Sequence, residues 1–529
     1  MRGISDPAKA YIEARAASIS GRPAQAAEIL ATLAEGSANP DLRDRAVYEA
    51  MSAGDMKLAL RLLKTSPRPA ASFNAKLLLV AEALKERRDA EAIRLLGPDV
   101  GGPDLSFWTP LVRAWNAAER KDTTGALTIL SEVPANSALK SFVDEQAAFM
   151  LLRMGRPSDA PPYVERALSN AGPREYRLRL VLAEAYRSAG DEQHAIELID
   201  KLPENAALLR RSLQQGRLKP LAINSSATAF ADQLLALAME IRRSPRAATP
   251  PLLMVQVARY AAPQNSATTI LLGSLLGEEG RIDDALAALR SVPADDPLKP
   301  EAIDSESRAL LEEERLDEAL ALAQSAVARP GATGDDFARL GDVYGELERH
   351  DEAAAAYAQA IERLSQAGNS RLWPLLLLRG SELEKAGRWP ESKAVLNAAV
   401  AMAPNEPLIL NFLGYSKLEH GEDLDAAEAL VRKASELAPD NASITDSLGW
   451  ALYKRGRYDE AIDILQSAAI ADPVQAEIHE HLGDALYAAG RRFEARFAWE
   501  AALATAAEAD VTRIRSKIAT GLTQATAAR

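Results

Sequence analysis

Small and apolar residues recur along this chain with a period close to 34 residues. The clearest case lies near the C-terminal end, where Leu448-Gly449 and Leu482-Gly483 are 34 residues apart. An alanine follows each leucine after thirteen residues, and another follows seven residues later: Ala461, Ala468, Ala495 and Ala502. Turn and closing residues sit between these positions: Gly456, Gly490 and Pro473. Two short helices per period, joined by a tight turn, account for this pattern.

The small position of the first helix in each period can be followed through fourteen units. Its residues are Ala14, Val47, Val80, Ala114, Ala148, Ala183, Met239, Gly273, Ser307, Gly341, Gly380, Gly414, Gly449 and Gly483. Eleven of the thirteen steps are within one residue of 34. A small residue there lets the two helices of a hairpin cross closely, and glycine and proline end the helices at the turns. The chain is therefore predicted to be all-α, an α-solenoid of about fourteen helical hairpins.

Two irregular steps divide this array. Residues 7–202 are predicted to form about six degenerate units, and residues 232–509 about eight regular ones. The step of 56 residues between them predicts an irregular insertion at 203–231, and Gln366–Ser370 predicts a longer connection. Residues 510–529 are expected to form a capping helix and tail, because a solenoid must cover its open apolar end.

The amino-acid composition excludes some classes of function and makes others less expected. Hydrophobic residues make up 47% and charged residues 26%, as in folded soluble proteins, and the net charge is -13. An acidic chain repels phosphate backbones, so we do not expect nucleic acid as the main partner. The best basic patch is interpreted as solvated helix ends and loops: Arg210, Arg211, Arg217, Lys219, Arg242, Arg243 and Arg246. With no cysteine, disulfides and thiolate chemistry are excluded.

Reactive groups do not converge anywhere in the sequence. His194, His350 and His420 stand alone near predicted turns and are expected to be solvated. His479 and His481 lie two residues apart on a helix, on nearly opposite faces, so they cannot bind one metal together. No Walker A loop, nucleophile elbow or dinucleotide-binding fingerprint is present. We therefore expect no enzymatic activity, no metal and no cofactor.

Targeting signals are also absent from the sequence as it stands. Met1–Pro7 is not followed by the apolar region of a signal peptide. The longest apolar stretches, such as Leu375–Leu378, are far too short to cross a bilayer. A cytosolic protein or a mature, trimmed form is expected.

The repeat resembles the tetratricopeptide repeat, whose pattern is W-x2-L-G-x2-Y, then A-x3-F, then P. The motif Gly-Arg-Xaa-Asp/Glu-Glu/Asp-Ala appears nearly intact at Gly280–Ala285 and Gly456–Ala461. This resemblance implies a right-handed superhelix. Residues 405–505 further resemble the C-terminal repeats of large bacterial tetratricopeptide proteins of the periplasm or cell envelope, which implies a role in envelope integrity through protein contacts.

In this repeat family the first helix of each hairpin, helix A, lines the concave surface. The corresponding positions here are candidate partner-binding residues: Asn411, Tyr415, Asp446, Trp450, Tyr453, Lys454, Glu480, Asp484 and Tyr487. Aromatic anchors with polar neighbours are typical of protein interfaces. The alternative is that Trp450, Tyr453 and Tyr487 pack between helices. Packing is the expectation for a further four residues: Phe412, Tyr458, Phe493 and Trp499.

These observations favour a non-enzymatic scaffold that binds a protein or peptide on its concave face, in the bacterial envelope and most simply in the periplasm. A cytoplasmic adaptor for assembly or regulation is the alternative. A repeat array attached to an enzyme, such as a glycosyltransferase, is disfavoured because the repeats occupy almost the whole length.

Overall fold

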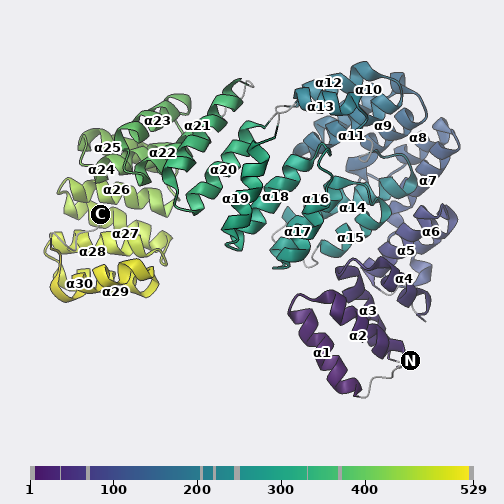
Figure 1. Cartoon of the computed structure of the whole chain (residues 1–529), viewed down its shortest axis with the longest axis horizontal. Coiled ribbons are helices and arrows are strands. Elements are labelled where there is room, and N and C mark those ends of the chain that lie inside the picture. The colour runs from purple at the N-terminus through teal and green to yellow at the C-terminus, as the bar shows by residue number, and fades with distance from the viewer. Residues whose placement is uncertain are drawn as a thin grey trace. The chain divides into compact units, whose positions relative to one another are not determined.

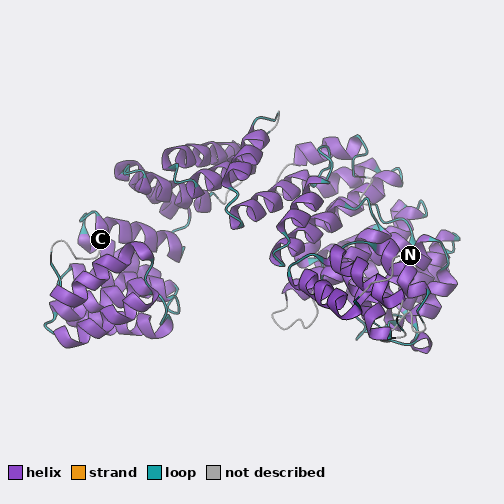
Figure 2. Ribbon diagram, turned by 60° about the horizontal axis from the view of Figure 1, so that its bottom comes forward, coloured by secondary structure: helices purple, strands orange, loops and turns teal. Residues whose placement is uncertain are grey.

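The fold is built from helices alone in every part of the chain that can be described (Figure 2). The computed structural model describes residues 6–35, 37, 39–66, 72–202, 206–218, 222–243, 251–329, 332–366 and 372–523. Within these ranges there is no strand, which confirms the predicted all-α class.

The described helices fall into fourteen consecutive pairs. The first six are α1 (Pro7–Ile19) and α2 (Pro23–Glu35), α3 (Pro40–Ser52) and α4 (Met56–Lys64), α5 (Phe73–Lys85) and α6 (Asp89–Leu96), α7 (Thr109–Glu119) and α8 (Thr123–Ser131), α9 (Val143–Arg153) and α10 (Pro161–Ser169), and α11 (Glu175–Ser188) and α12 (Glu192–Asp200). The next four are α14 (Ser226–Arg243) and α15 (Leu252–Ala261), α16 (Ser266–Glu278) and α17 (Ile282–Arg290), α18 (Lys299–Glu312) and α19 (Leu316–Val327), and α20 (Gly334–Glu346) and α21 (His350–Gln366). The last four are α22 (Trp373–Lys385) and α23 (Trp389–Met402), α24 (Pro407–Glu419) and α25 (Leu424–Leu437), α26 (Ala442–Lys454) and α27 (Tyr458–Ala471), and α28 (Ala476–Ala488) and α29 (Arg492–Thr505). The predicted number of repeats is confirmed.

Two helices stand outside the pairs. α13 (Ala206–Gln214) follows the sixth pair, and α30 (Glu508–Thr520) follows the last and packs on α29, as expected of a cap. Short 3-10 helices occur only in the first half of the described chain: η1 (Pro98–Val100), η2 (Ser106–Trp108), η3 (Lys140–Phe142), η4 (Pro157–Asp159) and η5 (Gly172–Arg174). Within the predicted insertion 203–231, α13 is regular and α14 already begins at Ser226. Most of the predicted longer connection, residues 367–370, lies outside the described residues.

The small position of helix A is buried in thirteen of the fourteen pairs, because the second helix, helix B, crosses there. A Cβ added at Gly449 would lie 2.5 Å from Cγ of Leu465, and one added at Gly483 would lie 2.4 Å from Cδ1 of Trp499. Any larger side chain would therefore separate the two helices. The exception is Met239, which is only partly buried. The spacing therefore did not select a buried position in the seventh pair, whose first helix, α14, is the longest of the first helices.

The chain divides into two compact units, Met1–Leu322 and Ala323–Arg529. One large hydrophobic core in the N-terminal unit runs from Ala10 to Leu298, and Leu289, Val292 and Ala302 form a small separate cluster. Figure 1 labels the helices of this unit, α1 to α18. In the C-terminal unit the described cores are smaller clusters that each join neighbouring helix pairs. The C-terminal unit is therefore a regular stack, whereas the N-terminal unit has one shared interior.

The shared interior of the N-terminal unit is formed by α14 and α15, which pack against the first helices of earlier pairs. α15 contacts α3 and α5, and α14 contacts α5 and α7. Phe230 of α14 meets Trp108 edge-on, with ring centroids 5.3 Å apart. Lys85 Nζ donates to the carbonyl of Tyr260 at 2.7 Å, joining α5 to α15. The seventh pair thus covers the helix-A face of the pairs before it.

Buried charges fasten α14 in this position. The Glu145 carboxylate on α9 accepts a hydrogen bond from Arg174 at 2.9 Å and another from Gln233 of α14 at 3.4 Å. Arg177 of α11 forms an ion pair with Asp232 of α14. Burial and the nearby Asp232 carboxylate raise the pKa of Glu145 to about 7. Polar groups this deep must be paired, so they fix which helices lie side by side.

Candidate functional site

The helix-A face of the C-terminal unit is the candidate partner-binding face, and α24, α26 and α28 supply its residues. Ile444, Leu448 and Leu452 of α26 are buried, so the opposite face of this helix cannot be reached. Asn441 caps α26 by accepting a hydrogen bond from the amide of Ile444. The cap and the buried apolar side chains fix how α26 presents Asp446, Trp450 and Tyr453.

Trp450 is buried between neighbouring helices. Its indole ring stacks on His481 at 4.0 Å and on Tyr453 at 4.7 Å, and its Nε1 donates to Glu419 at 2.7 Å. Asp446 is also buried and pairs with Nδ1 of His481 at 2.9 Å. The alternative considered for Trp450, packing between helices, is what the structure contains.

The His481–Asp446 pair joins α26 to α28 through a charge. Burial alone would lower the pKa of His481, but the Asp446 carboxylate outweighs burial, so the pKa is raised. The Asp446 carboxylate thus favours the imidazolium form of His481. Aromatic stacking and ion pairing of this kind fix the position of each helix A relative to the next.

Glu480 and Asp484 of the last pair are buried beneath α30. Lys517 Nζ lies 2.6 Å from Glu480 and 2.7 Å from Asp484, and Arg513 also pairs with Glu480. Trp499 Nε1 donates to Asp484 at 2.9 Å. Two basic residues of the cap, spaced four residues apart, therefore occupy the acidic positions that a partner was expected to contact.

Burial lowers the pKa of Lys517 to about 8, although the Asp484 carboxylate acts in the opposite direction. The ammonium group is fully enclosed, and its carboxylate partners compensate for the lost hydration. Tyr487, the remaining predicted residue of α28, is partly exposed beside Gly521 at the end of α30. A Cβ at Gly521 would lie 2.3 Å from the Tyr487 hydroxyl oxygen, so the chain passes close to the hydroxyl end of this side chain.

The remaining predicted residues are partly exposed: Asn411, Tyr415, Tyr453 and Lys454. The Tyr415 hydroxyl donates to Glu477 at 3.1 Å, a bond that joins α24 to α28 across the intervening pair. Lys454 Nζ lies 3.3 Å from Glu419 and 4.8 Å from the centre of the Trp450 ring. Burial raises the pKa of Tyr453 to about 12 and also raises the pKa of Tyr415, so both phenols stay protonated at neutral pH.

One polar atom on this face lacks a hydrogen bond. The carboxamide oxygen of Asn411 is buried and accepts no hydrogen bond from the described residues. An unmet buried acceptor costs about 1–3 kcal/mol. A donor supplied by a partner, reached after a small rotation of the amide, would recover part of this energy.

Four residues of the face were not predicted from the sequence: Glu419, Glu477, Arg513 and Lys517. Reading fixed offsets within each repeat did not select Glu419 and Glu477, although both carboxylates bind aromatic side chains of the face. A sequence signal did exist for the cap, because Arg513 and Lys517 lie four residues apart on one face of the last helix.

Two expectations about other aromatic residues need correction. Trp499 is buried as predicted, and Phe412 packs partly against the Trp389 cluster. Phe493 was also expected to pack, but it is 74% exposed on α29 and meets only the 56% exposed Phe497 edge-on. Tyr458 is exposed as well. Their helix positions face outward, which the repeat pattern alone did not resolve.

The lone histidines are paired rather than simply solvated. Nδ1 of His194 lies 2.8 Å from Asp191, and Nδ1 of His350 lies 2.8 Å from Glu382. His420 lies 3.3 Å from Glu384 and stacks on Trp389. No cluster of three or more metal-binding side chains occurs in the part of the chain that the structure describes.

The basic patch is largely neutralised where it can be described. Arg210 pairs with Asp200, and Arg242 lies 2.5 Å from Glu278. Lys219 and Arg246 lie outside the described residues. None of the helices within the described ranges combines the length and hydropathy that a bilayer-crossing segment needs.

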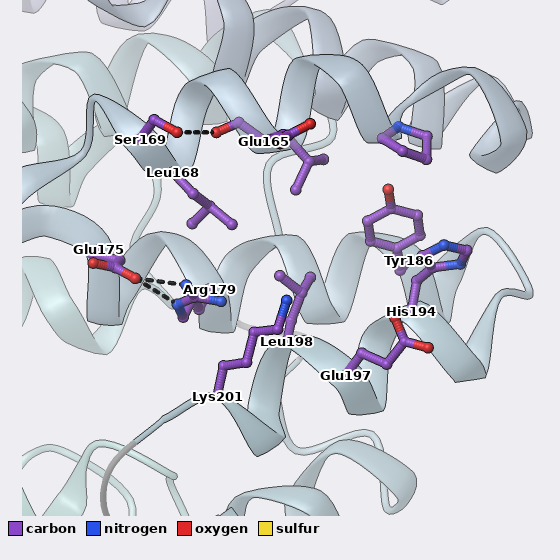
Figure 3. Close-up of a pocket in the computed structure, with 12 residues that line it drawn as sticks. Glu165, Leu168, Ser169, Glu175, Arg179, Tyr186, His194, Glu197, Leu198 and Lys201 are labelled. Carbon is purple, nitrogen blue, oxygen red and sulfur yellow. Dashed lines mark hydrogen bonds and ion pairs between the residues drawn. The ribbon is translucent and has the colours of Figure 1, made fainter.

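A pocket of about 600 Å³ opens in the N-terminal unit between α10 and the α11–α12 pair (Figure 3). Arg179 donates to Glu175 at 2.6 Å on one side, and Tyr186 stacks on His194 at 5.2 Å on the other. Charges of both signs line this pocket, and its Arg179 is already paired with Glu175. Its walls therefore indicate no single ligand class.

Comparison with known proteins supports the repeat assignment. Sequence profiles described as tetratricopeptide repeat match residues 150–208, 270–334, 337–363, 377–442 and 417–480. The TPR repeat-containing protein PA4667 of Pseudomonas aeruginosa is 32% identical over 94 residues, which cover 18% of this chain. The match spans only 16% of that relative's length.

Two solved structures show low similarity to this chain. The chain is similar to one in the APC/C hetero-tetramer Cut9-Hcn1, with 15% identity, 98% and 97% coverage of the two chains and a TM-score of 0.40. A crystal structure of MamA has 20% identity, covers 37% of this chain and 98% of its own, and gives a TM-score of 0.28. At these scores the likenesses carry no functional information. The repeat pattern, the helix pairs and the profile matches together identify the chain as a tetratricopeptide repeat protein, and its repeats support a scaffold for protein interaction.

Proposed function

We propose that the C-terminal unit binds a protein segment rich in lysine and arginine along the helix-A face of α24, α26 and α28. The observation that carries this proposal is the contact of α30 with the end of that face. There, Lys517 and Arg513 bind Glu480 and Asp484 through buried ion pairs. A cationic helix is thus already a good ligand for this surface.

The neighbouring part of the face offers the same chemistry to a partner. Glu419 and Glu477 are carboxylates, and each binds an aromatic side chain of the face, Trp450 and Tyr415 respectively. Partly exposed tyrosine rings provide flat apolar surface and attract cations through their π-electrons. Carboxylates beside aromatic rings favour arginine and lysine over acidic side chains.

An experiment can separate this face from the rest of the chain. The protein would be crosslinked to its partners in the native host, and the crosslinked segments would be identified by mass spectrometry. A Tyr453→Ala, Glu477→Gln variant is expected to lose segments of net positive charge. A matched Phe493→Ala, Phe497→Ala variant removes exposed aromatic surface from α29 and is expected to keep them.

Two results of this crosslinking experiment would contradict the proposal. If both variants retain the same crosslinked segments while circular dichroism shows an unchanged fold, the face does not bind the partner. Crosslinked segments of net negative charge would also contradict the proposal. Tyr453 is partly exposed and Glu477 is exposed, and Tyr453 also packs on Trp450, so circular dichroism is needed to separate a lost contact from a lost fold.

We further propose that this scaffold works in the bacterial envelope, in the periplasm. The support is the resemblance of residues 405–505 to envelope tetratricopeptide proteins, together with the absence of cysteine. Fractionation of the native host with an antibody to the chain tests the location. Recovery with the cytoplasmic fraction would favour the alternative, an adaptor for cytoplasmic assembly or regulation.

A further inference from the structure

A second pocket of the N-terminal unit, about 820 Å³ in volume, lies where three successive repeats meet the start of α14. Its walls come from the ends of α5, α7 and α9, from the turns that follow them, and from the segment that leads into α14. We call it the turn pocket. Five charged residues line it, four cations and one carboxylate: Lys85, Arg87, Lys121, Arg153 and Glu119. The lining therefore has a net charge of +3, in a chain whose net charge is -13.

The four cations of the turn pocket have no carboxylate partner among the described residues. Arg87 and Lys121 are exposed, and their side chains form no hydrogen bond or ion pair within the described part of the chain. Lys85 Nζ donates to the carbonyl of Tyr260 at 2.7 Å, and Arg153 Nε donates to that of Asn224 at 3.4 Å. These neutral carbonyls hold two of the side chains in place without cancelling their charge.

The carboxylates nearest to these cations along the chain are engaged elsewhere. Glu86 lies 2.7 Å from Arg88, and Asp122 caps the start of α8. Glu119, which lines the pocket, accepts a hydrogen bond from the amide of Ser226 at 3.4 Å. The positive charge of the turn pocket is therefore left for an anion that enters it.

The backbone at Arg87 and Lys121 also distinguishes these two cations. Their φ angles are 56° and 63°, in the left-handed region that disfavours any residue with a Cβ. Glycine takes this turn position after most of the first helices, as at Gly456 and Gly490. Two consecutive repeats thus place a cation where glycine would be less strained. Backbone strain of this kind is concentrated at functional sites.

The helix dipole accounts for only part of this cluster. A cation at the C-terminal end of a helix is stabilised by the dipole, and Lys85 and Arg153 are the last residues of α5 and α9. Arg87 and Lys121 lie two residues beyond the ends of α5 and α7, and the dipole's effect falls off within the last turn. Their charge is therefore better explained by what the pocket receives.

We propose that the turn pocket binds a small ligand that carries two or more phosphate groups. A phosphate group carries about 1.5 to 2 negative charges at neutral pH, so two of them balance the net charge of +3. Arginine can bind phosphate through two parallel N–H bonds, and lysine adds a compact charge. The volume of about 820 Å³ lies within the range of small-molecule pockets, roughly 300–1,000 Å³.

The turn pocket is separate from the helix-A face of the C-terminal unit. All of its lining residues belong to the N-terminal unit, so the two sites share none. Its ligand is anionic, whereas the partner proposed for the helix-A face is cationic and meets Glu419 and Glu477 there. A phosphate probe is repelled by those carboxylates. Failure of one proposal therefore does not imply failure of the other.

The test titrates the full chain with sodium pyrophosphate by isothermal titration calorimetry. At an ionic strength of about 0.1 M, exposed charges more than about 10 Å apart are largely screened. The Arg87→Gly, Lys121→Gly variant is expected to bind at least tenfold more weakly than the parent. Glycine fits a positive φ, so this variant is expected to stay folded, with a melting temperature close to that of the parent.

A matched control makes the same change at the same turn position in other repeats. Glu314→Gly, Glu348→Gly replaces two further residues with positive φ after first helices, neither of which lines the pocket, and is expected to bind within twofold of the parent. The helix-A variant Glu419→Gln, Glu477→Gln is expected to do the same.

Three results would overturn the proposal. One is the absence of pyrophosphate binding by the parent, and another is equal binding by the parent and the Arg87→Gly, Lys121→Gly variant. The third uses citrate, whose charge is carried by three carboxylates, as a second probe. Citrate is expected to bind more weakly than pyrophosphate, and equal binding would show that the pocket does not select phosphate.

Discussion

In the N-terminal unit, α14 and α15 cover the helix-A face of earlier pairs, whereas in the C-terminal unit the same face leaves Tyr415, Tyr453 and Lys454 partly exposed. Both units are built from the same hairpin. The difference lies in what fills the inner face: a hairpin of the chain itself in one unit, and only α30 at the end of the other. The helix-A face of a repeat array is therefore buried where a later hairpin of the same chain packs on it, and it stays accessible where none does.

The largest loss of stability is expected from removing a buried side chain that holds α14 against the earlier pairs. Phe230→Ala deletes a fully buried ring against Trp108, which should destabilise the N-terminal unit by about 3–5 kcal/mol. Hydrogen exchange measured by mass spectrometry should speed up in α5, α7 and α14 and stay unchanged in α24–α29. Acceleration throughout the chain would mean that the two units unfold together.

The cap offers the next largest effect. Lys517→Met leaves Asp484 and Glu480 with less compensation in a buried site, at a cost of about 3 kcal/mol. Amide exchange should accelerate in α28–α30 and not in the N-terminal unit. The matched control is Arg491→Met, which breaks an exposed, solvent-screened pair with Glu494 and should have no measurable effect on amide exchange. If the two changes had similar effects, the buried pairs of Lys517 would contribute no more to stability than an exposed ion pair.

The two units should also lose stability in different pH ranges. The pKa of Glu145 is raised to about 7, so its stabilising effect is complete below its unfolded value of about 4.3 and is lost as pH rises through 7. At about 1.4 kcal/mol per pKa unit, the loss should be on the order of 3 kcal/mol in the N-terminal unit. The groups facing Glu145 are Arg174, Arg177, Asp232 and Gln233.

The raised pKa of His481 gives the C-terminal unit a pH dependence of its own. Its stabilising effect is complete below an unfolded value of about 6.5 and is lost as pH rises through the folded value. Denaturation followed by hydrogen exchange at pH 5, 7 and 9 would resolve the two units. Glu145→Gln should remove the first pH dependence only, and His481→Gln the second only. A common pH profile for both units would contradict the assignment.

The smallest effect concerns the open face alone. Tyr415→Phe removes one hydroxyl that bonds to Glu477 and keeps the ring, so we expect a loss of about 0.5–1 kcal/mol. Exchange at the start of α28 should accelerate slightly, with no change in the N-terminal unit. Tyr458→Phe, on an exposed helix-B position, serves as the control and should have no measurable effect.

Much of the fold followed from spacing, but the candidate site did so only in part. Gly449 and Gly483 recur at 34 residues because a hairpin cannot close over a larger side chain, and this steric demand is local. Asp484 and Glu480 had the right helix position, yet their surroundings depended on Lys517, more than thirty residues away. The position of a residue within its repeat predicts which way its side chain points. Whether that side chain is buried depends on the helices that pack on it from other parts of the chain.

The irregular middle of the chain illustrates the same point. α14 and α15 are buried on nearly all sides, from Ala229 to Ala236 and from Leu252 to Ala258. The sequence Ala229-Phe-Ala-Asp-Gln-Leu-Leu-Ala236 lacks a polar face, and this was the signal of an enclosed helix. Interpreting it only as another repeat missed its role, because the spacing of hairpins does not reveal where the chain turns back.

The sequence by itself determined the helical hairpin, its fourteen-fold repetition and the need for a final cap. These depend on contacts within one hairpin or between neighbours, so they are written locally in small residues, turn glycines and prolines. Only the tertiary structure decided which inner face is open. α14 and α15 cover α3, α5 and α7 through contacts between residues more than a hundred positions apart. The spacing of small residues within the repeats does not predict such contacts.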